Sequence, residues 1–252
     1  MATRQQKKLK ILLIGDTCTD VYQYGIVERI SPEAPVPVFK LSHQEEKPGM
    51  AGNVQQNLLK FGFEVFAVTG MVSTKTRLID MKSKQHIVRI DADKHTDVGV
   101  PIGVLRDYLK DIDAVVVSDY NKGMVSYELL ESIVKEFPKL PVFVDTKKTD
   151  LARLEGCFVK INNTEFNLAK SIPTDLIVTL GDLGARYKDT VYPAEKIEVT
   201  DVTGAGDTFL AALTYQYLKT KKIEKAIEFA IKASSVTVQH IGVYAPSLEE
   251  IA

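Results

Sequence analysis

Residues 113–145, DAVVVSDYNKGMVSYELLESIVKEFPKLPVFVD, place one helix between two apolar strands. The runs at 113–119 and 141–145 are short, continuous and rich in valine, which is typical of strands buried on both faces of a sheet. Between them, residues 124–137 carry apolar side chains at helical spacing. This order predicts a right-handed βαβ unit with parallel strands.

The same alternation continues in both directions along the chain. Further apolar strands are expected at 8–15, 64–70, 157–161 and 175–181, and helices at 51–62, 164–170, 205–220 and 223–239, with a short last helix. Residues 26–46 contain three prolines and predict an exposed edge segment, while residues 75–91 have the two-residue period of a hairpin. We expect one α/β domain over residues 1–252, with a small β lid formed by about 26–46 and 75–91.

Composition excludes several classes of protein. The net charge of −1 gives no broad electrostatic reason to bind nucleic acid or an acidic membrane. No apolar run approaches the ~20 residues of a membrane span. Cys18 and Cys157 are far apart and indicate a reducing compartment, so we expect a cytoplasmic protein. The basic start, MATRQQKKLK, is expected to be a frayed terminus disordered over 1–7 rather than a targeting peptide.

Polar residues follow the predicted strands. In open α/β sheets, ligands bind beyond the carboxyl ends of the strands. The residues at or just past these ends are Asp16, Asp119, Asp145, Asn162 and Gly181. We expect the functional site at this edge of the sheet.

The loop DVTGAGDTF (201–209) precedes a predicted helix. The unpaired first amides of a helix and its dipole form an anion site, and Gly204 and Gly206 let the backbone approach a ligand. Asp207 would then reach a substrate alcohol and accept its proton during phosphoryl transfer. In the other interpretation, Asp207 only caps the helix.

The longer string DVTGAGDTFLAA closely resembles the C-terminal signature of the ribokinase-like (PfkB) sugar kinases. The resemblance implies a ribokinase-like three-layer α/β/α sandwich with a mainly parallel sheet and a small β lid. It also implies that Asp207 is the catalytic base and that Gly204, Ala205 and Gly206 form the anion hole. ATP and Mg²⁺ are the implied cofactors, and the implied small-molecule partners are ATP and a sugar or sugar phosphate.

Four other strings resemble motifs of the same family. GDTCTDVYQYG and PGMAGNVQQNL imply sugar contacts by Asp20, Gly49 and Asn53. NNTE resembles the N-x-x-E motif and implies that Asn162 and Glu165 organise magnesium and phosphates, with Glu165 acting on the metal through water. TLGDLG implies ATP-phosphate contacts near Thr179, Gly181 and Gly184. In isolation, Asn53 and Glu165 could be helix-start residues, Asp20 a turn cap, and the two glycines a hairpin turn.

Within the family, RISPEAPVPVF, QHIVRID, SDYNKG and VDTKKTD resemble the branch that phosphorylates D-glycero-β-D-manno-heptose 7-phosphate at O1 with ATP. A substrate that already carries a phosphate needs cations, for which Arg77, Arg89 and Lys122 are candidates. Lys147 is a similar candidate for a nucleotide or substrate phosphate. A PfkB-type kinase for another sugar or a nucleoside, and a shortened inactive binding module, stay open.

The sequence departs from the family pattern at several points. Met50 replaces a glycine and could narrow the sugar site, and Ile231 stands where this branch often has an asparagine. A helix and a strand, a few dozen residues in all, are missing between Val72 and Ser73. The branch's nucleotidyltransferase domain is absent, so we expect that this chain alone does not complete ADP-heptose synthesis. Because family members often pair through the lid, we expect a homodimer with no nucleic-acid or membrane partner.

Overall fold

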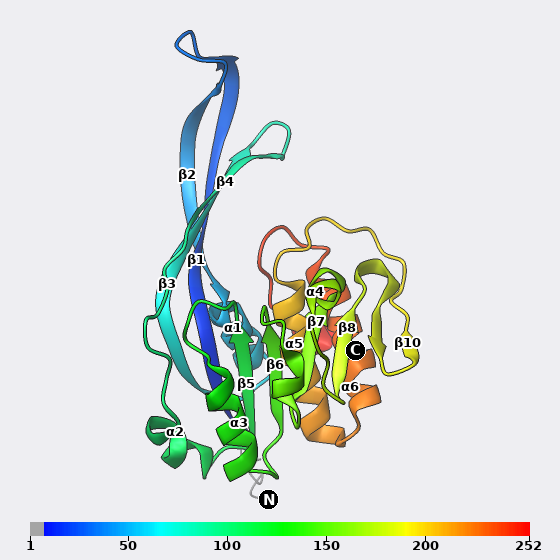
Figure 1. The fold of residues 1–252 in the computed structure, drawn as a ribbon. Coiled ribbons are helices and arrows are strands. Elements are labelled where there is room, and N and C mark those ends of the chain that lie inside the picture. Colours follow the sequence, from blue (N-terminus) through cyan, green and yellow to red (C-terminus); the bar gives the residue numbers. More distant parts are fainter. Residues whose placement is uncertain (1–7) are drawn as a thin grey trace, which may run out of the picture.

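A computed structural model describes residues 8–252, and the fraying expected at 1–7 lies outside the described residues. One large sheet runs through the molecule in the order β10-β9-β8-β7-β6-β5-β1-β3-β4, and β2 also pairs with β1 (Figure 1). The central strands are parallel, and β2, β4, β9 and β10 are antiparallel to their neighbours. The strands are β1 (Lys10–Ile30), β2 (Pro37–Met50), β3 (Glu64–Asp80), β4 (His86–Ala92), β5 (Ala114–Asp119), β6 (Val142–Thr146), β7 (Phe158–Asn162), β8 (Leu176–Thr179), β9 (Ala185–Tyr187) and β10 (Thr190–Tyr192).

Helices cover both faces of the central strands. Successive valines of β5 point to opposite faces, so that Val116 belongs to one apolar core and Val115 and Val117 to the other. Helices α1, α5 and α6 pack on the first core, and α2 and α3 pack on the second. The helices are α1 (Ala51–Lys60), α2 (Ile102–Leu109), α3 (Tyr127–Glu136), α4 (Asn163–Leu168), α5 (Ala205–Thr220), α6 (Ile223–Thr237) and α7 (Leu248–Ile251). The predicted three-layer α/β/α fold is confirmed.

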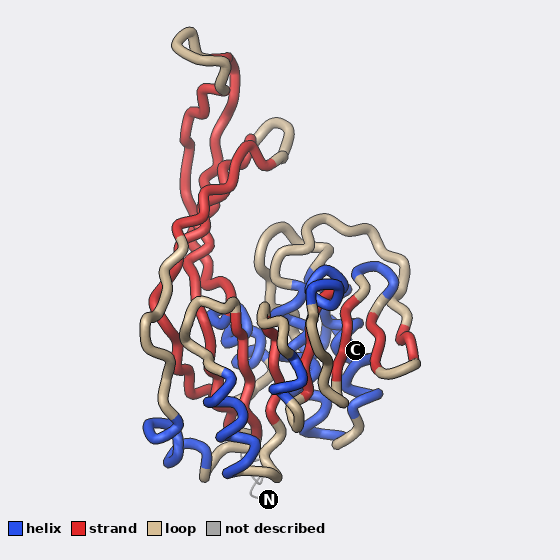
Figure 2. Tube along the Cα trace, viewed as in Figure 1, coloured by secondary structure: helices blue, strands red, loops and turns tan. Residues whose placement is uncertain are grey.

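The lid is a direct extension of the central sheet. Residues Ile11–Gly15 of β1 pair with β5, whereas from Thr17 onward the same strand pairs with β2. β3 likewise continues from the body into the lid, without a helix between Val72 and Ser73. Figure 2 shows these strands running from the body into the lid, where the β1–β2 hairpin extends beyond the end of β3. The prediction of separate core and lid strands is therefore wrong, because β1 and β3 stay paired with each other along both parts.

Two features were not predicted. Helix α2 has Pro101 at its N-cap position and no side-chain cap, so its start carries no polar signal in the sequence. Strands β9 and β10 have three residues each, too few for a recognisable alternation.

Two predictions made from composition concern membrane-spanning segments and disulfide bonds. No helix in the described part of the chain is long and apolar enough to cross a membrane. Cys18 and Cys157 are both buried and unpaired, which agrees with the expected lack of a disulfide framework.

Candidate active site

Asp207 lies in the first turn of α5 and is 6% exposed. The helix follows Gly204, whose φ of 81° lies in the left-handed region that favours glycine. Asp207 makes no capping hydrogen bond to the helix. Instead, its Oδ2 accepts from Asn53 Nδ2 at 2.9 Å and its Oδ1 from the Tyr120 hydroxyl at 3.4 Å. The interpretation of Asp207 as a helix cap is therefore wrong.

The surroundings of Asp207 change its acidity. Burial raises the pKa of the carboxyl group from 3.8 to about 7, because the charged form loses its hydration. The hydrogen bond from Asn53 and the positive charge of Lys160 act in the opposite direction, and the negative charges of Asp145 and Asp20 add to the rise in pKa. A carboxylate with a pKa near neutrality is a more effective proton acceptor at physiological pH than an ordinary aspartate.

The backbone around the glycine loop is closely packed on the site residues. A Cβ atom at Gly204 would lie 2.7 Å from Asn53 Nδ2, and one at Gly206 would lie 2.8 Å from Lys160 Nζ. Lys160 itself forms a buried ion pair of 2.7 Å with Asp145. The Ala205 amide donates to the Val202 carbonyl at 3.3 Å, so the next amides of the first helical turn are the better donors to an anion.

The predicted sugar-binding residues lie where the lid meets the body. Asp20 is buried and forms an ion pair with the buried guanidinium of Arg77. A Cβ at Gly49 would overlap the Asp20 carboxylate, so glycine is required there. Met50 has φ 54° and ψ −129°, a conformation that suits glycine better than methionine, which agrees with its place in the family pattern.

The other predicted phosphate ligands are already paired. The ammonium group of Lys122 lies 2.6 Å from Asp93. Arg89 forms a two-point contact with Asp91 on the exposed part of β4, and the structure does not place it beside Asp207. Neither side chain is free of a protein partner.

Asn162 and Glu165 meet at the start of α4. They form a reciprocal capping box, in which Asn162 Oδ1 accepts from the Glu165 amide at 2.9 Å and Glu165 Oε2 accepts from the Asn162 amide at 2.8 Å. Glu165 is therefore a helix-start residue, as the alternative interpretation expected. Its second oxygen contacts the ammonium group of Lys147, so this acidic group also belongs to a charged cluster beyond the strand ends.

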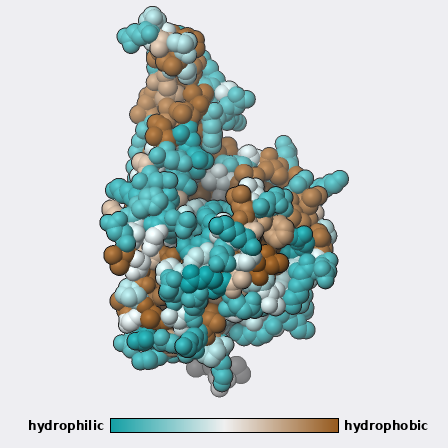
Figure 3. Space-filling model, in the orientation of Figure 1, coloured by the Kyte–Doolittle hydropathy of each residue, from teal (hydrophilic) through white to brown (hydrophobic). Residues whose placement is uncertain are grey.

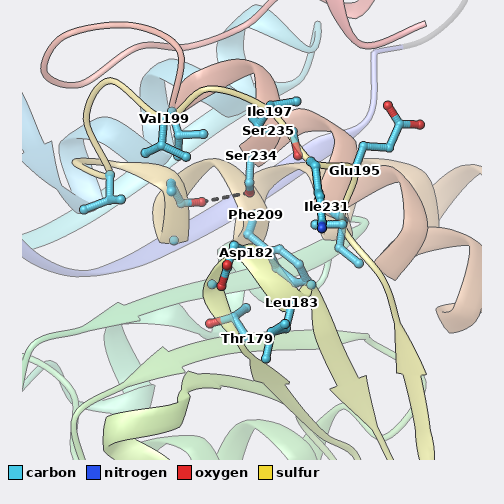
Figure 4. A pocket seen from close by; sticks show the side chains of 18 residues that line it. Thr179, Asp182, Leu183, Glu195, Ile197, Val199, Phe209, Ile231, Ser234 and Ser235 are labelled. Carbon is cyan, nitrogen blue, oxygen red and sulfur yellow. Dashed lines mark hydrogen bonds between the residues drawn. The ribbon is translucent and has the colours of Figure 1, made fainter.

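A cavity of about 460 Å³ opens beside the glycine loop. Thr179 and the turn Gly181–Gly184 form one side of it, and Ala205 and Gly206 form another. Figure 4 shows Phe209 and Ile231 pointing into the apolar part, with Ser234 held by a 3.0 Å hydrogen bond to the Ala205 carbonyl. The turn also joins the antiparallel strands β8 and β9, so it is a hairpin and a cavity wall at once. The cavity therefore reaches from the predicted phosphate loops to the start of α5.

Three residues of the site were not predicted. Tyr120 lies within the quoted string SDYNKG and reaches Asp207, while Lys75 lies 5.3 Å from the Tyr120 ring. Lys160 lies two residues before Asn162, the first residue of the N-x-x-E motif, and its ammonium group packs against Gly206. The nearby motifs were the only signal for these residues, because their contacts join distant parts of the chain. The carboxylate of Asp16 accepts hydrogen bonds from the amides of Tyr120 and Lys122 and so fixes the loop that carries Tyr120.

The chain is similar to known carbohydrate kinases. A family model described as pfkB family carbohydrate kinase matches residues 155–251. The bifunctional protein HldE of Campylobacter curvus is 33% identical over 307 aligned residues, which cover 97% of this chain and 64% of that protein. HldE of Helicobacter pylori strain J99 is 30% identical over 304 residues, with coverages of 96% and 65%. The alignments are longer than this chain, so these relatives contain segments that it lacks.

Solved structures share the fold. A microbiome-derived acarbose kinase, Mak1, has a TM-score of 0.73 at 15% identity, covering 97% of this chain and 98% of that one. Ribokinase of Arabidopsis thaliana, complexed with ribose and ATP, has a TM-score of 0.72 at 16% identity and covers 97% of each chain. Phosphofructokinase-2 of Escherichia coli has a TM-score of 0.69 at 16% identity, again with 97% coverage of both.

Proposed function

Because this chain belongs to the pfkB family of carbohydrate kinases, a family of phosphotransferases, we propose that it transfers the γ-phosphoryl group of ATP to a sugar hydroxyl. The observation that carries the proposal is the Asp207 carboxylate, held by Asn53 at the start of a helix that also borders a cavity. The carboxylate thus belongs to the same helical turn as Ala205 and Gly206, which line the cavity.

Asp207 accepts the proton of the attacking hydroxyl group. Its pKa of about 7 leaves a substantial fraction ionised at neutral pH, and phosphates nearby would raise the pKa further. The first amides of α5, at Gly206 and Asp207, hold the negative charge that gathers on the transferring group. In phosphoryl transfer, such positioning and charge stabilisation supply most of the catalysis.

ATP occupies the cavity beside the glycine loop. Phe209 and Ile231 give an apolar surface for the adenine base of ATP. The Gly181–Gly184 turn and Thr179 lie toward the phosphate groups. The Arabidopsis ribokinase relative, solved with ribose and ATP, supports ATP as the donor. Lys147, at the edge of the charged cluster, is the candidate cation for the nucleotide phosphates.

A bound Mg²⁺ ion would neutralise negative charge on the phosphates. No group of three His, Cys, Asp or Glu side chains within residues 8–252 is arranged to bind a metal on its own. Glu165 would hold a Mg²⁺ ion through water. Asn162 fixes the Glu165 carboxylate through the capping box.

The proposed acceptor is O1 of D-glycero-β-D-manno-heptose 7-phosphate or a related phosphosugar. The HldE relatives and the four branch-specific strings support this acceptor. Asp20 and Asn53 bind the sugar hydroxyls, and the lid excludes water so that ATP is not hydrolysed without an acceptor. The chain spans 64% of the length of the Campylobacter relative, so the full activity of that protein is not assigned to it.

The lid supports a proposed homodimer. Exposed apolar residues gather on it (Figure 3), among them Ile30, Val36, Leu41, Val88 and Ile90. Lid strands have open edges, and pairing of two lids would cover both the edges and these side chains. Use of ATP and two unpaired thiols support the proposed cytoplasmic location.

ADP release with magnesium-ATP across heptose, hexose and nucleoside substrates, with and without phosphate groups, tests the proposal. We expect turnover with heptose 7-phosphate, lost by at least about 10²-fold in Asp207→Asn. Turnover confined to another acceptor would refute the heptose assignment and leave the kinase. No turnover with any acceptor, by a protein that still binds ATP, would establish an inactive binding module instead.

A further inference from the structure

Two lysines flank Asp20 within the lid sheet. In the β1–β2 register Asp20 is opposite Lys47, and in the β1–β3 register it is opposite Lys75. Residues opposite each other on neighbouring strands point to the same face of a sheet. With strands ~4.8 Å apart, the two lysine Cα atoms lie about 10 Å apart across Asp20. One face of the lid thus presents two ammonium groups on either side of a single carboxylate.

This face of the lid is directed toward the candidate active site. The Lys75 ammonium lies 5.3 Å from the centre of the Tyr120 ring, and the hydroxyl of that ring reaches Asp207. The Lys47 ammonium lies 5.6 Å from the Tyr22 ring, which is 1% exposed. Both lysines are half-buried. A ligand beside Asp20 would therefore be within reach of both cations.

The two lysines differ from the neighbouring cations in their partners. Arg77 forms an ion pair with Asp20, and Lys122 forms one with Asp93. In the described part of the chain, no carboxylate lies within ion-pair distance of Lys47 or Lys75. Their ammonium groups contact aromatic rings, those of Tyr22 and Tyr120, rather than carboxylates. They are therefore the cations of this face that have no anionic protein partner.

The charge balance indicates the ligand. Asp20 is paired with Arg77, Asp93 with Lys122, and Asp91, which is opposite Lys75 on β4, with Arg89. Lys47 and Lys75 therefore leave two positive charges without a carboxylate partner. A phosphate monoester carries ~−1.5 to −2 at neutral pH, whereas a carboxylate carries only one negative charge. We propose that Lys47 and Lys75 bind the phosphate group that the acceptor sugar already carries, and that Arg77 is a positioning residue that orients Asp20. This rests on the proposed function and names the residues that select a phosphorylated acceptor.

Binding in the absence of ATP tests the proposal without requiring catalysis. Calorimetry would compare heptose 7-phosphate, mannose 6-phosphate and fructose 6-phosphate with their unphosphorylated counterparts. We expect at least one phosphorylated sugar to bind tenfold or more tightly than its counterpart. Lys47→Gln and Lys75→Gln should each weaken that binding by about tenfold and leave binding of the neutral counterpart unchanged.

Lys139→Gln is the matched control, because it removes the same charge at an exposed position between α3 and β6. It should leave both affinities unchanged. The proposal is overturned if no phosphorylated sugar is preferred, if Lys47→Gln and Lys75→Gln keep the preference, or if both variants weaken neutral and phosphorylated sugars equally. Tighter binding of a sugar acid such as 2-keto-3-deoxygluconate than of any sugar phosphate would also overturn it.

The outcomes separate this inference from the proposed function. A protein that prefers phosphorylated sugars through these lysines but transfers no phosphoryl group would refute only the kinase activity. A protein that phosphorylates neutral and phosphorylated sugars with equal KM would refute only the lysine site.

Discussion

Asn53 Nδ2 donates a hydrogen bond of 2.9 Å to Asp207 Oδ2, across 154 residues of sequence. Asn53 lies in the first turn of α1, three residues after Met50 at the end of lid strand β2. Asp207 lies in the first turn of α5. The bond therefore connects the start of the lid to the proposed catalytic carboxylate. A shift of β2 would displace Asn53, the hydrogen-bond donor to Asp207.

Asn53→Ala should raise the pKa of Asp207 above its value of about 7, because the hydrogen bond from Asn53 stabilises the ionised form. The acidic limb of kcat/KM against pH should move upward, by about one unit. Part of the activity lost at pH 7 should thus return near pH 9. A uniform loss at every pH would contradict this coupling and leave only a structural role for Asn53.

The stability of the fold should depend on pH through Asp207. The pKa of this group is raised on folding, so its contribution is complete below the unfolded pKa of 3.8 and is lost as pH rises to about 7. The free energy of unfolding should fall by about 1.4 kcal/mol per pH unit in this window, roughly 4 kcal/mol in all. Other carboxyl groups also titrate here, so a matched variant is needed.

Asp207→Asn provides that comparison, because it cannot titrate and keeps an oxygen for the Asn53 donor. Urea unfolding at pH 5, 6, 7 and 8 should show the variant gaining stability relative to the wild type as pH rises, although its activity is lost. A constant difference across this range would contradict a buried carboxyl group with a raised pKa.

Gly204→Ala should reduce both stability and activity. The residue has a positive φ, and the new Cβ would lie 2.7 Å from Asn53 Nδ2, displacing the partner of Asp207. We expect a loss of about 1–3 kcal/mol in unfolding free energy and a larger fractional loss in kcat.

Gly103→Ala is the control for the glycine substitution. Gly103 lies in α2, and nothing lies within 4 Å of the Cβ position. There, alanine should be neutral or stabilise by roughly 0.5–1 kcal/mol, because it favours the helix. Equal effects of the two substitutions, measured by thermal unfolding, would contradict the special role of Gly204.

Leu41→Glu should dissociate the proposed homodimer. Leu41 lies on β2 in the lid and is 56% exposed in the single chain, and burial of a charge between two lids would be unfavourable. Light scattering after size exclusion should show dimers for the wild type and an increase of about tenfold or more in Kd for the variant. Val104→Glu, an exposed apolar site on α2, should have no effect. A wild-type monomer at high concentration would refute the dimer.

Sequence motifs predicted those residues of the candidate site that lie within contiguous stretches of the chain. The valine-rich strands and the loop before α5 follow from periodicity and from the positions of Gly204 and Gly206. The polar residues at strand ends fall on one edge because parallel strands share their direction. Tyr120 and Lys160 were not predicted, because neither belongs to a local pattern that points to Asp207.

The sequence by itself determined the layered α/β fold, the family resemblance and the residue types of the candidate site. These depend on short-range periodicity and on contiguous motifs. Only the tertiary structure decided that β1 and β3 run unbroken into the lid, that Asn53 meets Asp207, and that Lys47 and Lys75 stand on either side of Asp20. Strand register and helix docking are set by contacts between distant segments, and a shift of one residue would turn these side chains to the opposite face.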